Sequence, residues 1–213
     1  MTKNNPMTEA HERFKSDISQ SGKEHALEIV SENETMRYLV FKRPGSSVYR
    51  VNITTWPGYL CISGDMGCYV FSRLPDRFEF FRQMNPEMLD FRYIAEKTEG
   101  VAKCCGLECF SEEKVAELIN GLYDQYAEEN PESKDLDDLR AETDILINNI
   151  TDEDSLREAM EDDETARVLD LYQAVCEGPH LKEYTFHFQW CCHAIMHVIK
   201  LYDDLKGAEN VGK

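Results

Sequence analysis

The hydrophobic pattern of this 213-residue chain changes its period near residue 74, and this change constrains the fold more than any other feature. Between residues 26 and 73, apolar residues alternate or run in short stretches between turns, as they do in β-strands. The connection Gly64-Asp65-Met66-Gly67 has the residues typical of a hairpin. Beyond residue 74, apolar residues recur at helical spacing. We therefore expect an α+β fold, with an N-terminal antiparallel sheet of about five strands followed by a helical, strongly acidic C-terminal half.

The C-terminal half contains a series of amphipathic helices and a final helix that is almost continuously apolar. The expected helices cover residues 111–126, 136–150, 153–160, 165–176 and 184–205. Because the last of them has few polar positions, we expect it to be buried on most sides and to pack on the sheet. A short helix is also expected before the sheet, with His11 and Phe14 near one face.

Two regions follow from these patterns. Residues 1–110 form a mixed region of sheet and short helices, and residues 111–213 form an acidic helical region whose last helix returns to the sheet. A single domain overall is also compatible with this organisation.

Most of the net charge lies in one block. Residues 111–170 carry 21 Asp and Glu against 5 Lys and Arg, whereas the other 153 residues carry 20 against 18. Such a block repels nucleic acid and anionic membranes and attracts basic protein surfaces, including those that hold DNA or RNA. The candidate partner-binding residues are Glu117, Asp124, Glu128, Glu129, Asp135, Asp137, Asp138, Glu142 and Asp144.

The spacing of these acids suggests mimicry of nucleic acid. Acids three or four residues apart on a helix lie about 5 Å apart along one side, and duplex DNA carries one charge per about 1.7 Å of axis. Two helical rows would approximate such a track. The alternatives are a solvated face of an acidic protein and a calcium site. The runs 152–154 and 161–164 lack the glycine turn of a calcium loop.

Two histidines on the last helix are candidates for a metal site. His193 and His197 lie four residues apart, so their imidazoles share a face. Such a site needs ligands from elsewhere, for which Cys104, Cys105 and Cys109 are available. The metalloprotease pattern His-Glu-x-x-His is absent. We expect core or hydrogen-bonded histidines, with no metal and no cofactor.

The aromatic segment around the predicted hairpin has two interpretations. Its rings can form cross-strand pairs that support the sheet. Alternatively, they line an open groove for a small ligand or a peptide, made by Trp56, Tyr59, Asp65, Tyr69 and Arg73.

The same segment resembles a known family. The sequence TWPGYL-x-ISGDMG-x-YVFSR, residues 55–73, looks like a family of uncharacterised proteins in tailed phages and prophages of enteric bacteria. The resemblance continues through Phe78–Arg82 and Phe188–Cys192. It implies a phage accessory protein acting in the cytosol of a bacterial host, and it implies no catalytic residues.

Other features agree with a cytoplasmic location. The N-terminus lacks the apolar core of a secretory signal, and the chain has no apolar run of about 18 residues. The eight cysteines are accordingly expected to be reduced. No nucleophile, phosphate-loop or dinucleotide motif occurs, which favours a protein that is not an enzyme.

We therefore predict a phage-encoded binding protein that blocks a host defence protein. Its acidic helices would occupy a basic, nucleic-acid-binding surface of that partner, with no direct contact to nucleic acid or membrane. The alternative is a small-ligand-binding or sequestering protein, or a metal-dependent enzyme, that uses the sheet and the helix with His193 and His197. The long apolar helices also allow a homo-oligomer.

Overall fold

The computed structural model describes residues 6–19, 25–34, 36–72 and 78–211. The contacts between residues divide the chain into two compact units. The first contains residues 1–107 and 184–213, and the second contains residues 108–183. The second unit is therefore an insertion in the first, and the last helix belongs with the sheet. We describe each unit by itself.

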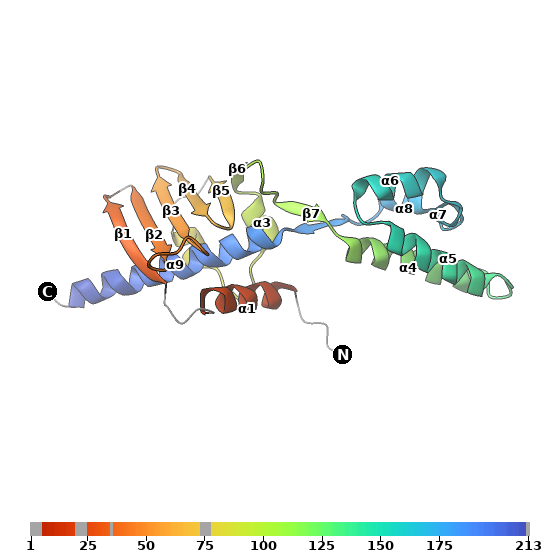
Figure 1. The fold of residues 1–213 in the computed structure, drawn as a ribbon, viewed down its shortest axis with the longest axis horizontal. Coiled ribbons are helices and arrows are strands. Elements are labelled where there is room, and N and C mark those ends of the chain that lie inside the picture. The colour runs from red at the N-terminus through yellow and green to blue at the C-terminus, as the bar shows by residue number, and fades with distance from the viewer. Residues whose placement is uncertain (1–5, 20–24, 35, 73–77, 212–213) are drawn as a thin grey trace. The chain divides into compact units, whose positions relative to one another are not determined.

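The described part of the first unit contains a six-stranded antiparallel sheet in the order β1-β2-β3-β4-β5-β6 (Figure 1). The strands are β1 Ala26–Glu32, β2 Arg37–Lys42, β3 Val51–Trp56, β4 Tyr59–Gly64, β5 Gly67–Phe71 and β6 Thr98–Val101. Two short helices, α2 Glu79–Arg82 and α3 Phe91–Ala95, lie in the chain between β5 and β6. The predicted α+β class and the N-terminal antiparallel sheet are confirmed.

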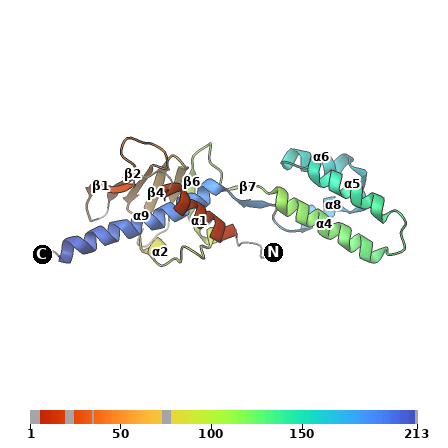
Figure 2. The ribbon, with the colours of Figure 1, turned by 60° about the horizontal axis from the view of Figure 1, so that its bottom comes forward.

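One face of the sheet is apolar, as the period-two pattern requires. Val51, Ile53 and Thr55 of β3 are buried, and the residues between them are half-buried. These buried positions share a core with α9, Phe186–Val211, which packs on the sheet as expected from its apolar sequence. Helix α1, Pro6–Ser19, lies against α9 (Figure 2). Trp190 of α9 is fully buried and donates a hydrogen bond from Nε1 to Asp17 of α1, over 3.1 Å.

The second unit is helical (green and teal in Figure 1). Its helices are α4 Glu112–Glu129, α5 Leu136–Asn149, α6 Glu153–Asp162, α7 Glu164–Val168 and α8 Leu171–Glu177. Strands β7, Glu108–Phe110, and β8, Lys182–Tyr184, pair with each other where the chain enters and leaves the unit. A separate core contains Val115, Ile119, Leu146 and Leu169 among its buried residues.

The continuous helix expected over residues 165–176 is wrong, because the chain breaks it into α7 and α8. Asp170 adopts a left-handed conformation at the break, with φ of 51°. Aspartate tolerates this conformation better than most residues. The apolar spacing alone gave no sign of the break, since both pieces contribute buried residues to one core, Ala166 from α7 and Leu171 from α8.

None of the helices in the described part of the chain combines the length and the apolar run that crossing a membrane requires.

Candidate functional site

The net charge of the protein belongs to one unit. Residues 108–183, here called the acidic unit, contain 24 Asp and Glu against 6 Lys and Arg. The remaining residues, here called the neutral unit, contain 17 of each. The boundary between the units is therefore also a boundary in charge, and the whole net charge of −18 lies on the helical insertion.

The carboxylates of the acidic unit face solvent. All of its Asp and Glu residues are exposed except Asp163, which is half-buried and caps α7 by accepting a hydrogen bond from the Ala166 amide over 3.0 Å. Asp152 caps α6 in the same way, and hydrogen bonds from Ser155 lower the pKa of its carboxyl group. Because they face solvent, the carboxylates can be reached by a partner without unfolding of the unit.

The predicted partner-binding residues of α4 form a row. Glu117, Asp124 and Glu128 lie on the side of the helix opposite Val115 and Ile119, which are buried. Glu113 extends the row at its N-terminal end, so that the row covers about 22 Å of helix. Glu129 lies off this row and accepts a hydrogen bond from Gln125 over 3.0 Å.

The predicted residues of α5 do not form a second row. Arg140 forms an ion pair with Asp144 over 3.0 Å and lies over the Tyr123 ring of α4, so this flank of α5 faces α4. Glu142 lies on the opposite flank and accepts a hydrogen bond from Thr165 of α7 over 3.2 Å. By helical spacing, Asp137 falls on the flank of Asp144 and Asp138 falls on the flank of Glu142, whereas Asp135 is the N-cap residue that precedes the helix. The acids within α5 are therefore divided between two opposite flanks and do not form a single row.

The structure does not gather the residues of the proposed aromatic groove. Trp56 and Tyr59 stack at the turn between β3 and β4, with ring centroids 5.4 Å apart. Asp65 lies at the other end of β4, where it accepts a hydrogen bond from the Tyr49 amide over 2.9 Å. Tyr69 is fully buried in the core, and burial raises the pKa of its phenol. Arg73 lies outside the described residues.

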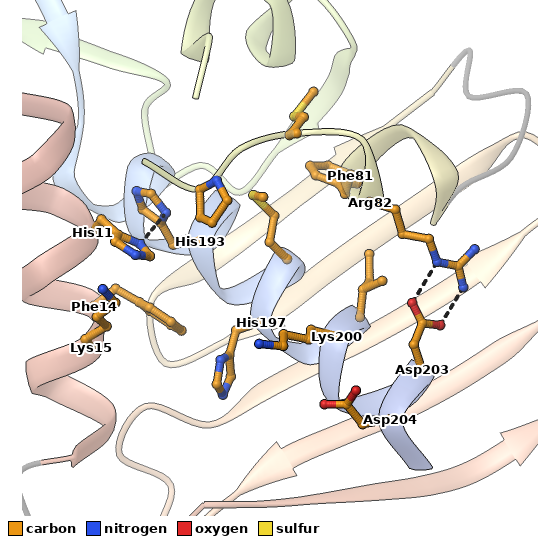
Figure 3. A pocket seen from close by; sticks show the side chains of 14 residues that line it. His11, Phe14, Lys15, Phe81, Arg82, His193, His197, Lys200, Asp203 and Asp204 are labelled. Carbon is orange, nitrogen blue, oxygen red and sulfur yellow. Dashed lines mark hydrogen bonds and ion pairs between the residues drawn. The ribbon is translucent and has the colours of Figure 1, made fainter. Parts of the chain in front are cut away.

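A cavity of about 600 Å³ lies in the neutral unit between α1, α9 and the segment that follows α2 (Figure 3). Phe14, Phe81 and Ile199 contribute apolar surface to it. Arg82 closes one side by donating two hydrogen bonds to Asp203, over 2.7 and 2.8 Å. The volume lies within the range of about 300 to 1,000 Å³ that is typical of small-molecule sites.

Three imidazoles line this cavity (Figure 3). The Nδ1 atoms of His11 and His193 lie 3.3 Å apart, so one of them donates the shared proton to the other. Burial lowers the pKa of His193 to about 4, with smaller contributions from His11 and Lys15. Burial also lowers the pKa values of His11 and His197. At neutral pH the cavity therefore presents uncharged imidazoles, which can donate or accept hydrogen bonds.

The cavity carries charged groups in addition to its imidazoles. Across the described ranges, no group of three or more His, Cys, Asp and Glu side chains is placed to hold a metal ion. Lys15, Lys200 and Asp204 add charged groups at the cavity. His193 and His197, which the sequence singled out, thus share a site with His11 of α1. The sequence had indicated His11 only as a residue near the apolar face of the predicted N-terminal helix.

Searches of protein-family models, of curated proteins and of solved structures find no match to this chain.

Proposed function

We propose that this protein is a non-enzymatic binding protein whose acidic unit engages a basic surface of another protein. The observation that carries the proposal is the complete segregation of net charge: residues 108–183 hold the whole −18, and all of their Asp and Glu residues except Asp163 are exposed. A helical unit of this kind creates a strong negative potential, which repels nucleic acid and draws a basic partner into encounter.

The expected partner is a protein that handles nucleic acid. Basic surfaces of that kind bind phosphates mainly through Lys and Arg, and a carboxylate row can compete for the same groups. The α4 row, with Glu113, Glu117, Asp124 and Glu128, is the best candidate for this contact. The resemblance of residues 55–73 to a phage family supports a bacterial host cytosol as the setting and a defence protein as the target.

A pull-down from bacterial lysate tests the proposal. The tagged protein should retain a basic protein after nuclease treatment and release it as the salt concentration rises, because the attraction is screened. A variant with Glu113, Glu117, Glu128 and Glu129 changed to Gln, and Asp124 changed to Asn, should lose the partner while remaining folded, because all five positions are exposed on α4.

A matched variant of the neutral unit controls for the change in net charge. It carries Glu28→Gln, Glu34→Gln, Glu87→Gln, Glu96→Gln and Asp204→Asn, all at exposed positions. This variant should bind as the unmodified protein does. The proposal is wrong if both variants bind alike, or if nuclease alone abolishes capture.

The cavity of the neutral unit favours a second candidate function, the binding of a small molecule. Its apolar surface and its imidazole and ammonium groups suit a ligand with an apolar body and a polar or anionic end. Mass spectrometry of an extract from freshly purified, denatured protein tests this. A Met196→Trp variant, which fills the cavity, should lack any molecule that copurifies with the unmodified protein.

A further inference from the structure

The acidic unit contains a groove of its own. A cavity of about 400 Å³ lies between the C-terminal half of α4 and the junction of α7 and α8. We call it the α4–α8 groove. Leu122 and Tyr126 line it from α4, and because they lie four residues apart they form part of one stripe along the helix. Leu169 lines it from the α7–α8 junction and is buried.

The edge of the groove leaves an apolar side chain in solvent. Val168 ends α7, lines the groove and is 45% exposed. Exposed apolar surface next to a preformed groove is typical of a binding site for another molecule. Ile145 and Tyr172 of the same unit are also exposed, by 60% and 63%, but of these three side chains only Val168 lines the groove.

Charge complementarity determines which kind of molecule fits. Glu129 and Asp170 line the groove and are both exposed, and the unit around them carries a net charge of −18. A nucleic acid, a nucleotide or another anion is repelled there. A lipid tail would leave the carboxylates without partners. The complementary occupant has apolar side chains for the groove and basic side chains for its rim.

The geometry of the groove favours a helix as that occupant. One wall comes from α4 and the other from the end of α7 and the start of α8, and the space between packed helices accepts the row of side chains that a further helix presents at i, i+3 and i+4. Resting on the proposed function, we propose that the α4–α8 groove receives the apolar face of a basic amphipathic helix of the partner protein.

The groove and the carboxylates then have separate roles. The carboxylates accelerate encounter and make binding depend on salt. The groove distinguishes a partner helix with large apolar side chains from any other basic segment, because burying such a side chain adds affinity that charge cannot supply.

Two synthetic helical peptides test this division. Each has about 18 residues and the same number of lysines, long enough to form helix in water. One carries leucines along one face, and the other carries alanines at the same positions. The full-length protein should bind the leucine peptide about ten- to hundredfold more tightly, the range expected for burial of a large apolar side chain.

A matched pair of variants locates the contact. Val168→Asp removes apolar surface from the groove and adds a further negative charge. Ile145→Asp makes a similar change at a side chain of α5 that is 60% exposed and does not line the groove. Val168→Asp should reduce the preference for the leucine peptide to about threefold or less. Ile145→Asp should leave it unchanged, and neither should weaken binding of the alanine peptide.

The outcomes separate the groove from the proposed function. Equal affinity for the two peptides would overturn the groove and leave charge-driven binding intact. A preference that survives Val168→Asp, or that Ile145→Asp reduces equally, would also overturn the groove. Failure of both peptides to bind at low salt would overturn the proposed function itself.

Discussion

The two units of this protein are built on different balances of packing and charge. Among the described residues, the core cluster of the neutral unit contains 24 buried residues, ten of them aromatic, whereas that of the acidic unit contains eight, none aromatic. The smaller core carries the entire net charge. The large core and the strong electrostatic potential therefore belong to different units: the neutral unit is stabilised by its core, whereas the acidic unit has a strong negative potential and the repulsion between carboxylates that comes with it.

This difference bears on how each unit responds to its surroundings. Like charges on one compact unit destabilise it at low salt, and a small core leaves little stability to spare. The neutral unit has balanced charge, but it holds the buried His193 and the half-buried His11 and His197 at the α1–α9 contact with lowered pKa values, which makes it sensitive to acid instead. Mutation, pH and salt are therefore each expected to affect the stability of the two units differently.

The largest effect is expected from the core of the neutral unit. Trp190→Ala removes the fully buried indole and its hydrogen bond to Asp17, and it should destabilise this unit by about 3 to 5 kcal/mol. Hydrogen exchange read by mass spectrometry should show faster exchange in α9 and the sheet, with the helices of the acidic unit unchanged.

The control for this variant is Trp56→Ala, at a half-buried ring near the end of a hairpin. It should cost about 1 kcal/mol or less. If Trp190→Ala accelerates exchange in the acidic unit to the same extent, the two cores do not unfold separately and the comparison fails.

A smaller effect is expected from acid. Burial lowers the pKa of His193 to about 4, below the value of about 6.5 in the unfolded chain. Between these two values the unfolded state binds more protons, so stability falls as the pH decreases from about 6.5 toward 4. The shift corresponds to about 3 kcal/mol for the neutral unit.

Tryptophan fluorescence measures this effect in one unit, because Trp56 and Trp190 both lie in the neutral unit. Denaturant titrations at pH 7.5 and pH 5 should differ, and His193→Gln should reduce that difference. His187→Gln, at an exposed position of the same helix, should not. An identical pH dependence in both variants would show that His193 does not titrate as described.

The smallest effect is expected from salt. Raising the salt concentration from about 20 to 500 mM should increase the melting temperature of the acidic unit by about 5 °C, because repulsion between its carboxylates is screened. The melting temperature measured by tryptophan fluorescence reports on the neutral unit and should rise much less. The melting temperature measured by helical circular dichroism, a signal that includes the acidic unit, should show the larger rise. The variant with five neutralised carboxylates should show a smaller rise. Equal shifts in both signals would mean that repulsion is not concentrated in residues 108–183.

Part of the candidate site could be read from the sequence, and part could not. The block of acids and its helices were predictable, because charge and helical period are local properties of the chain. The directions in which the acidic side chains point were not predictable. Asp144 and Glu142 lie on opposite flanks of α5, and which element each flank faces depends on the neighbours that α5 packs against. The predicted aromatic groove failed for a similar reason, because Trp56 and Asp65 lie near opposite ends of β4 once the strands are paired.

The sequence by itself determined the α+β class, the hairpin at Gly64–Gly67 and the location of the charge, since alternation, helical spacing and composition are properties of short segments. Only the tertiary structure decided that the acidic helices form an insertion, that β6 completes the sheet, and that His11 meets His193 across 182 residues of chain. Such contacts depend on how distant segments share one core, and no local pattern encodes that choice.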